Sequence, residues 1–122
     1  MSKTQFRTGG PAYDTDQRGR TRDDYTPKYK WRPTYPGERC HHTNEPLQDF
    51  ITQIEGVQGG RISLDVTHFP GEWTWAGATP PGFKGSPILP HRGRELTARQ
   101  ACRRAEEYWD AMCTLRDQRE AE

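Results

Sequence analysis

The sequence predicts a small α+β domain preceded by a flexible N-terminal arm. Three features support this fold class: a hairpin-like alternation at residues 61–78, a long amphipathic pattern near the C-terminus, and a scarcity of aliphatic residues at the start. Of the fifteen Leu, Ile, Val and Phe residues, fourteen lie between Leu47 and Leu115. We therefore expect residues 1–43 to form the arm and residues 44–122 to form the domain, because the first segment has too little apolar surface to offset the entropy of ordering.

The arm is nevertheless rich in aromatic and basic residues as well as proline and glycine. A solvated tail is the plainest interpretation of such a segment. The alternative is a segment that folds on a partner, because aromatic residues and arginine are enriched at interface hot spots. On that hypothesis the partner-binding residues are Tyr25, Tyr29, Trp31, Arg32 and Tyr35.

The first element of the domain, Asn44 to Gly56, favours a short helix. Its apolar residues follow the i, i+3, i+4, i+7 spacing, with Pro46 suited to the first turn and Gly56 to the position after the last. The alternative is a short strand that leads through residues 57–60 into Arg61. This choice stays open at the sequence level.

The central element is a predicted β-hairpin from Arg61 to Ala78, with its turn at Pro70-Gly71. Placing Phe69 and Glu72 beside the turn pairs His68 with Trp73 and Val66 with Trp75. This register places an apolar set on one face of the hairpin: Ile62, Leu64, Val66, His68, Trp73 and Trp75. A lone hairpin is marginal in water, so we expect another element to cover that face.

The last element is a predicted helix from Thr97 to Arg119. Thr97 and Gln100 have the spacing of a capping box, and apolar residues recur along one stripe that can cover the Trp73 and Trp75 face. Between hairpin and helix, we expect the long irregular connection to be anchored by Phe83, Ile88 and Leu89.

Composition excludes some classes of function. The net charge of +1 provides no global field for nucleic acid or membrane, and no apolar run is long enough to span a bilayer. The start of the sequence lacks the apolar segment of a signal peptide, and three cysteines form no disulfide framework. We therefore expect a cytoplasmic protein, or one made inside a host cell if it is viral.

Neither a metal site nor a catalytic site is expected. Cys40, His41 and His42 are contiguous, whereas zinc ligands are usually two to four residues apart. The sequence has no nucleophile elbow, phosphate-binding loop or metalloprotease motif. We predict no catalytic residues, no metal and no cofactor, and keep a small enzyme or metal-binding protein only as a remote alternative.

A cluster of basic residues near the start of the last helix is a candidate anion site. Arginine there opposes the helix dipole, and such a conflict with local stability is enriched at functional sites. Pairing with nearby glutamates is the plainer interpretation. Together with two lysines of the arm, the cluster gives the candidate nucleic-acid residues Lys28, Lys30, Arg92, Arg94, Arg99 and Arg103.

These observations favour a non-enzymatic accessory protein that docks on a larger protein assembly, or on a second copy of the chain. A nucleic-acid-associated protein is the main alternative, and no membrane partner is expected.

Overall fold

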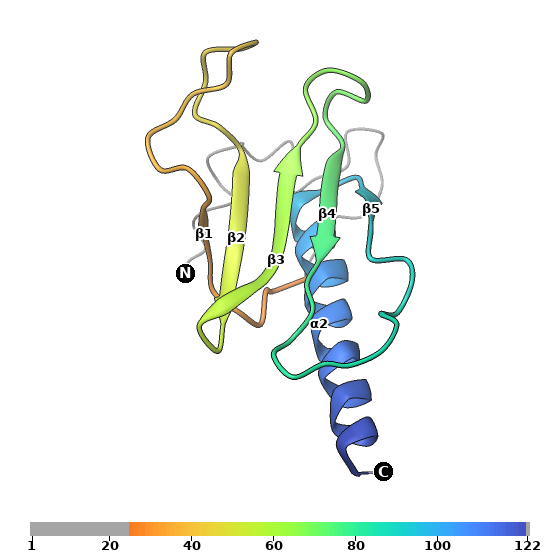
Figure 1. Cartoon of the computed structure of the whole chain (residues 1–122). Coiled ribbons are helices and arrows are strands. Elements are labelled where there is room, and N and C mark those ends of the chain that lie inside the picture. The colour runs from red at the N-terminus through yellow and green to blue at the C-terminus, as the bar shows by residue number, and fades with distance from the viewer. Residues whose placement is uncertain (1–24, 122) are drawn as a thin grey trace.

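Five antiparallel strands form one sheet, and a long helix packs on one of its faces (Figure 1). The computed structural model describes residues 25–121. The strands lie side by side in chain order and the helix follows them: β1 (Trp31–Pro33), β2 (Asp49–Ile54), β3 (Val57–Leu64), β4 (Trp73–Gly77), β5 (Arg92–Glu95) and α2 (Ala98–Ala121). The predicted α+β class, with a hairpin packed on a long C-terminal helix, is confirmed.

The favoured helix at Asn44 to Gly56 is wrong, and the alternative strand is what forms. β2 pairs with β3 through a two-residue turn at Glu55 and Gly56, whose φ angles are 54° and 81°. A two-residue turn with positive φ at both positions is of type I′, whose twist matches that of the paired strands. The apolar spacing suited a helix only because both faces of β2 are buried: Phe50 faces the helix and Ile51 the opposite side.

The central hairpin forms with its predicted faces but a different register. Trp75 pairs with Ile62 instead of Val66, and Trp73 pairs with Leu64 instead of His68. Since the displacement is an even number of residues, the apolar side chains stay on one face.

The cause of the register change is a longer connection between β3 and β4, closed by Asp65. The Asp65 carboxylate accepts the backbone N–H groups of Thr67 (2.9 Å), His68 (3.1 Å) and Phe69 (3.3 Å). The Asp65 backbone N–H in turn donates to the carbonyl of Glu72 (2.8 Å). An aspartate that binds the backbone of the residues after it forms a turn by itself, so Val66 and His68 leave the strand.

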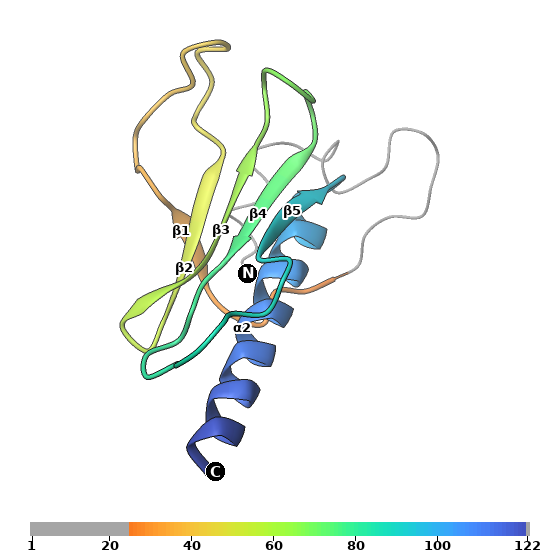
Figure 2. The ribbon, with the colours of Figure 1, turned by 45° about the vertical axis from the view of Figure 1, so that its right-hand side comes forward.

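The predicted C-terminal helix is confirmed and lies against the sheet (Figure 2). Its buried residues share one core cluster with Trp73 and Trp75, as predicted. The hydroxyl of Thr97 accepts the N–H of Gln100 (3.1 Å), which caps the helix. Glycines of the sheet allow close packing: a Cβ at Gly77 would lie 2.3 Å from the ring of Tyr108. The buried apolar residues of α2 are Ala98, Ala101, Cys102, Ala105, Tyr108, Trp109 and Met112.

The second part of the predicted arm belongs to the fold. β1 pairs with β2, and Trp31 is only 4% exposed in the core. The segment predicted as an arm thus contributes β1 and a core tryptophan to the domain, and residues 1–24 lie outside the described part. A single tryptophan and a strand partner supply the stabilisation that composition alone did not reveal.

A buried glutamate on α2 holds this segment in place. Glu106 is 2% exposed, and its carboxylate accepts hydrogen bonds from the Tyr25 hydroxyl, the Lys28 N–H (2.9 Å), the Tyr29 N–H (3.1 Å) and the Trp31 indole N–H (2.9 Å). A buried charge is tolerated where several donors replace its hydration. Residues 25–31 are thus fixed to the helix by one side chain.

The connection between β4 and β5 is anchored by Phe83 and Ile88, which pack on the core as predicted. Leu89 does not take part, since it is 71% exposed. The hydroxyl of Tyr108 adds a hydrogen bond to the carbonyl of Ile88 (2.8 Å). Among the described residues, no helix has the length and apolar character needed to cross a membrane.

Candidate functional site

The candidate site is the sheet face opposite α2, which we call the open face. Side chains alternate along a strand, so where Trp73 and Trp75 point toward the helix, Thr74 and Ala76 point away from it. The same alternation and the strand registers assign the remaining members. The open face consists of Arg32, Asp49, Ile51, Arg61, Ser63, Thr74, Ala76, Arg92 and Arg94.

Three arginines lie in one row across the open face. The registers pair Arg32 with Ile51, Ile51 with Arg61, Arg61 with Ala76 and Ala76 with Arg92. Neighbouring strands are about 4.8 Å apart, so the three arginine backbones, on β1, β3 and β5, are spaced by about 10 Å. The side chains of Arg32 and Arg92 are exposed and form no hydrogen bond or ion pair with another residue between 25 and 121. Their guanidinium groups are available to a ligand.

The two other arginines are held by aspartates. Arg61 donates to both carboxylate oxygens of Asp49 (2.9 and 2.7 Å), and these hydrogen bonds raise the pKa of Arg61. Arg94 donates to Asp65 (2.8 Å). The backbone N–H of Thr67, followed by the Arg94 guanidinium, lowers the pKa of the Asp65 carboxyl well below its usual range. Arg61 and Arg94 are thus oriented before any partner binds.

Each paired arginine also lies over an exposed aromatic ring. The Arg61 guanidinium is 5.7 Å from the ring centroid of Tyr35, and that of Arg94 is 4.6 Å from the ring of Phe69. Tyr35 is 48% and Phe69 53% exposed. Exposed aromatic rings beside arginine are typical of binding surfaces.

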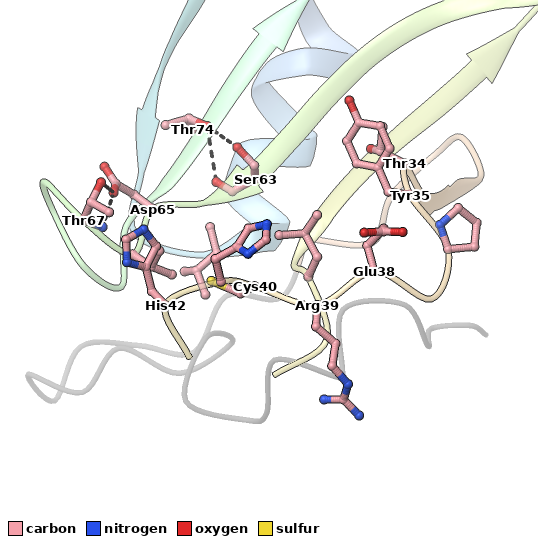
Figure 3. Close-up of a pocket in the computed structure, with 15 residues that line it drawn as sticks. Thr34, Tyr35, Glu38, Arg39, Cys40, His42, Ser63, Asp65, Thr67 and Thr74 are labelled. Carbon is pink, nitrogen blue, oxygen red and sulfur yellow. Dashed lines mark hydrogen bonds between the residues drawn. The ribbon is translucent and has the colours of Figure 1, made fainter. Parts of the chain in front are cut away.

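A cleft of about 700 Å³ opens between the β1–β2 connection and the start of the β3–β4 connection (Figure 3). Tyr35 and Glu38 lie on one side of it and Asp65 and Thr67 on the other. A second hollow of about 500 Å³ is lined by Arg61, Arg92 and Arg94. Both hollows include Ser63 and Thr74, whose hydroxyls hydrogen bond to each other (2.8 Å). The two hollows therefore adjoin at Ser63 and Thr74.

The contiguous Cys40, His41 and His42 line the cleft. The backbone N–H of His42 lowers the pKa of the Cys40 thiol. Within residues 25–121, however, no three His, Cys, Asp or Glu side chains are grouped so that they could hold a metal ion. Cys40, His41 and His42 are thus not part of such a group among the described residues.

The expected partner-binding residues are divided between two sides of the sheet. Tyr25, Tyr29 and Trp31 face α2, where the Tyr29 hydroxyl donates to Asp110 (2.6 Å) in addition to the bonds with Glu106. Arg32 and Tyr35 lie on and beside the open face. Of the five, Arg32 and Tyr35 are the two that are exposed and on the same side of the sheet.

The expected anion cluster is divided in the same way. Arg92 and Arg94 lie on the open face, whereas Arg99 and Arg103 are on α2. Arg99 donates to the backbone carbonyl of Tyr25 (3.0 Å), Arg103 pairs with Glu107 (3.0 Å), Lys28 pairs with Asp110 (2.6 Å), and the carbonyl of Lys30 accepts the hydroxyl of Thr52 (2.6 Å).

Sequence reasoning missed Arg61 and Asp49. The signal was present in the alternation itself, since Arg61 and Ser63 are the polar neighbours of Ile62 and Leu64. The true strand register was needed to see that Arg61 lies between Arg32 and Arg92.

Comparisons with family models, with curated proteins and with solved structures found no match to this chain.

Proposed function

We propose that this chain is a non-enzymatic accessory protein that docks an acidic protein partner on the open face. The observation that carries the proposal is the row of Arg32, Arg61 and Arg92 across the open face, with the hollow that Arg61 and Arg92 line. Arginine binds carboxylates through paired, planar hydrogen bonds. Two of the four arginines of this face, Arg32 and Arg92, are exposed and have no side-chain partner within residues 25–121, which suits them to a partner's carboxylates.

The surroundings favour a protein rather than a polyanion. Asp49 and Asp65 neutralise two of the four arginines, and their carboxylates would repel a closely spaced phosphate backbone. Tyr35 and Phe69 add the aromatic character that is enriched at protein interfaces. The net charge of the chain, +1, points the same way.

Nucleic acid is the second candidate, supported by the regular spacing of the arginine row and by its exposed rings. Single-stranded nucleic acids bind to sheets through arginine contacts to phosphate and stacking of bases on aromatic side chains. Tyr35 lines the cleft and is suited to such stacking, and Phe69, beside Arg94, offers a second exposed ring.

A direct binding measurement separates the two candidates. Fluorescence anisotropy of the full chain is recorded with a labelled polyglutamate peptide and with a polythymidine oligonucleotide of equal charge, at low and at physiological ionic strength. The test variant is Arg32→Gln/Arg92→Gln. The matched control, Lys84→Gln/Arg103→Gln, removes the same charge from an exposed connection and from α2.

We expect the test variant to bind polyglutamate at least about tenfold more weakly, because a hydrogen bond to a charged group contributes about 1.5–3 kcal/mol and 1.4 kcal/mol is a factor of ten. The control should change affinity by less than about twofold, since distant surface charges are screened. Tighter binding of the oligonucleotide, with a steep loss of affinity at higher salt, would favour the second candidate. Equal losses in the two variants would contradict a site on the open face.

A further inference from the structure

β5 forms one edge of the sheet, and no residue between 25 and 121 hydrogen bonds to the outer side of its backbone. The N–H of Gly77 donates to the carbonyl of His91 (2.7 Å), so these two residues are a hydrogen-bonded pair of the β4–β5 ladder. Hydrogen-bonded and non-hydrogen-bonded pairs alternate in an antiparallel ladder. Ala76 with Arg92 and Thr74 with Arg94 are therefore non-hydrogen-bonded pairs, and Trp75 with Gly93, which lies between them, is a hydrogen-bonded pair.

The alternation assigns a direction to each backbone group of β5. Gly93, like His91, points its N–H and carbonyl at β4, whereas Arg92 and Arg94 point theirs away from the sheet. Neither arginine has a backbone hydrogen bond to another described residue on that side. Two donors and two acceptors therefore stand in a row at the solvent edge.

The opposite edge, at β1, is closed to a regular ladder. The N–H of Thr34 donates to the carbonyl of Asp49 (2.9 Å), so Arg32 and Thr34 face β2 while Trp31 and Pro33 face outward. Proline has no N–H to donate, and proline on an edge strand prevents further pairing. Strand addition is thus possible at β5 and blocked at β1.

The side chains at the β5 edge select the charge of the added strand. Arg92 and Arg94 both lie on the open face, and a residue directly opposite either of them has its Cβ about 4.5–5.5 Å away on the same face. A second copy of this chain pairing through β5 would place arginine beside arginine, which is unfavourable. Acidic residues at alternate positions would instead meet both guanidinium groups.

We infer that β5 accepts an extended acidic segment of the partner protein as a sixth, antiparallel strand. This inference rests on the proposed function and adds how the partner is held. Backbone hydrogen bonds to Arg92 and Arg94 supply register, and carboxylates two residues apart supply specificity. Arg92 and Arg94 would therefore bind the partner strand both through their backbone groups and through their guanidinium groups.

Three synthetic peptides test this inference with the full chain. The first alternates threonine and glutamate. The second has the same sequence with N-methyl groups on the glutamates, whose N–H groups would face the carbonyls of Arg92 and Arg94. The third carries N-methyl groups on the threonines, whose N–H groups would face solvent, and is the matched control. Binding and amide hydrogen exchange are followed by NMR.

We expect the first and third peptides to bind and to slow amide exchange at Arg92 and Arg94 by at least about tenfold, since these N–H groups become hydrogen-bonded. The glutamate-methylated peptide should bind at least about tenfold more weakly, because it cannot complete the ladder.

Two outcomes separate the inference from the proposed function. If the three peptides bind equally and exchange at Arg92 and Arg94 is unchanged, acidic side chains occupy the open face without adding a strand, and only the inference fails. If none of the peptides binds, and polyglutamate does not bind either, the proposed function fails with it.

Discussion

Replacing Glu106 by glutamine tests the most unusual feature of the core. Each carboxylate oxygen accepts two hydrogen bonds: one oxygen from Tyr25 and Lys28, the other from Tyr29 and Trp31. The glutamine amide keeps one acceptor oxygen but presents an NH₂ group to the other two donors. A buried donor left without an acceptor costs about 1–3 kcal/mol, so we expect the Glu106→Gln variant to lose about 2–4 kcal/mol of unfolding free energy.

Urea denaturation measures this loss, with Glu107→Gln as the matched control. Glu107 is the next residue on α2, is exposed, and pairs with Arg103 at the helix surface. Such a pair contributes about 0.5 kcal/mol, so the control should unfold almost as the parent protein does. The indole N–H resonance of Trp31 reports the same site directly and should shift in Glu106→Gln alone. Equal midpoints for the two variants would refute the assignment of Glu106 as the anchor of residues 25–31.

Three further predictions concern pH and packing. Burial and the hydrogen bond to Asp110 raise the pKa of Tyr29 to about 12, so stability present below pH 10 should be lost between pH 10 and 12, and Tyr29→Phe should flatten that loss in thermal melts. The pKa of Asp65 is lowered, so its effect on stability has the opposite pH dependence. Its contribution to the unfolding free energy is present at neutral pH and should disappear as pH falls below about 4. The Asp65→Ala variant should lack this decline in urea titrations. Gly77→Ala should cost at least about 1–3 kcal/mol in urea unfolding, because the new methyl group would overlap the ring of Tyr108; an unchanged midpoint would mean that α2 can move away from β4.

Features set by neighbouring residues were readable from the sequence. The capping of α2 by Thr97 depends on a residue three positions away, and the shared face of Trp73 and Trp75 follows from alternation alone. The apolar stripe of α2 predicted correctly which side of the helix is buried. Each of these properties is local, so composition and period were sufficient.

Other features depended on partners far along the chain or on turn geometry. The apolar spacing of residues 44–56 favoured a helix, but the turn at Glu55 and Gly56 together with pairing to β1 and β3 makes residues 49–54 a strand. Asp65 lengthened the central loop and moved the register, although both faces survived.

The candidate site depended most on tertiary structure. Arg32, Arg61 and Arg92 are widely separated in sequence and meet only because β1, β3 and β5 share one sheet. Glu106 is one of several charged residues on α2, and its burial became visible only with the donors of residues 25–31, 75 to 81 positions earlier in the chain. Local periodicity determines which face of an element is apolar. Which polar groups are buried or gathered depends on long-range hydrogen bonds and strand order, which no short window of sequence contains.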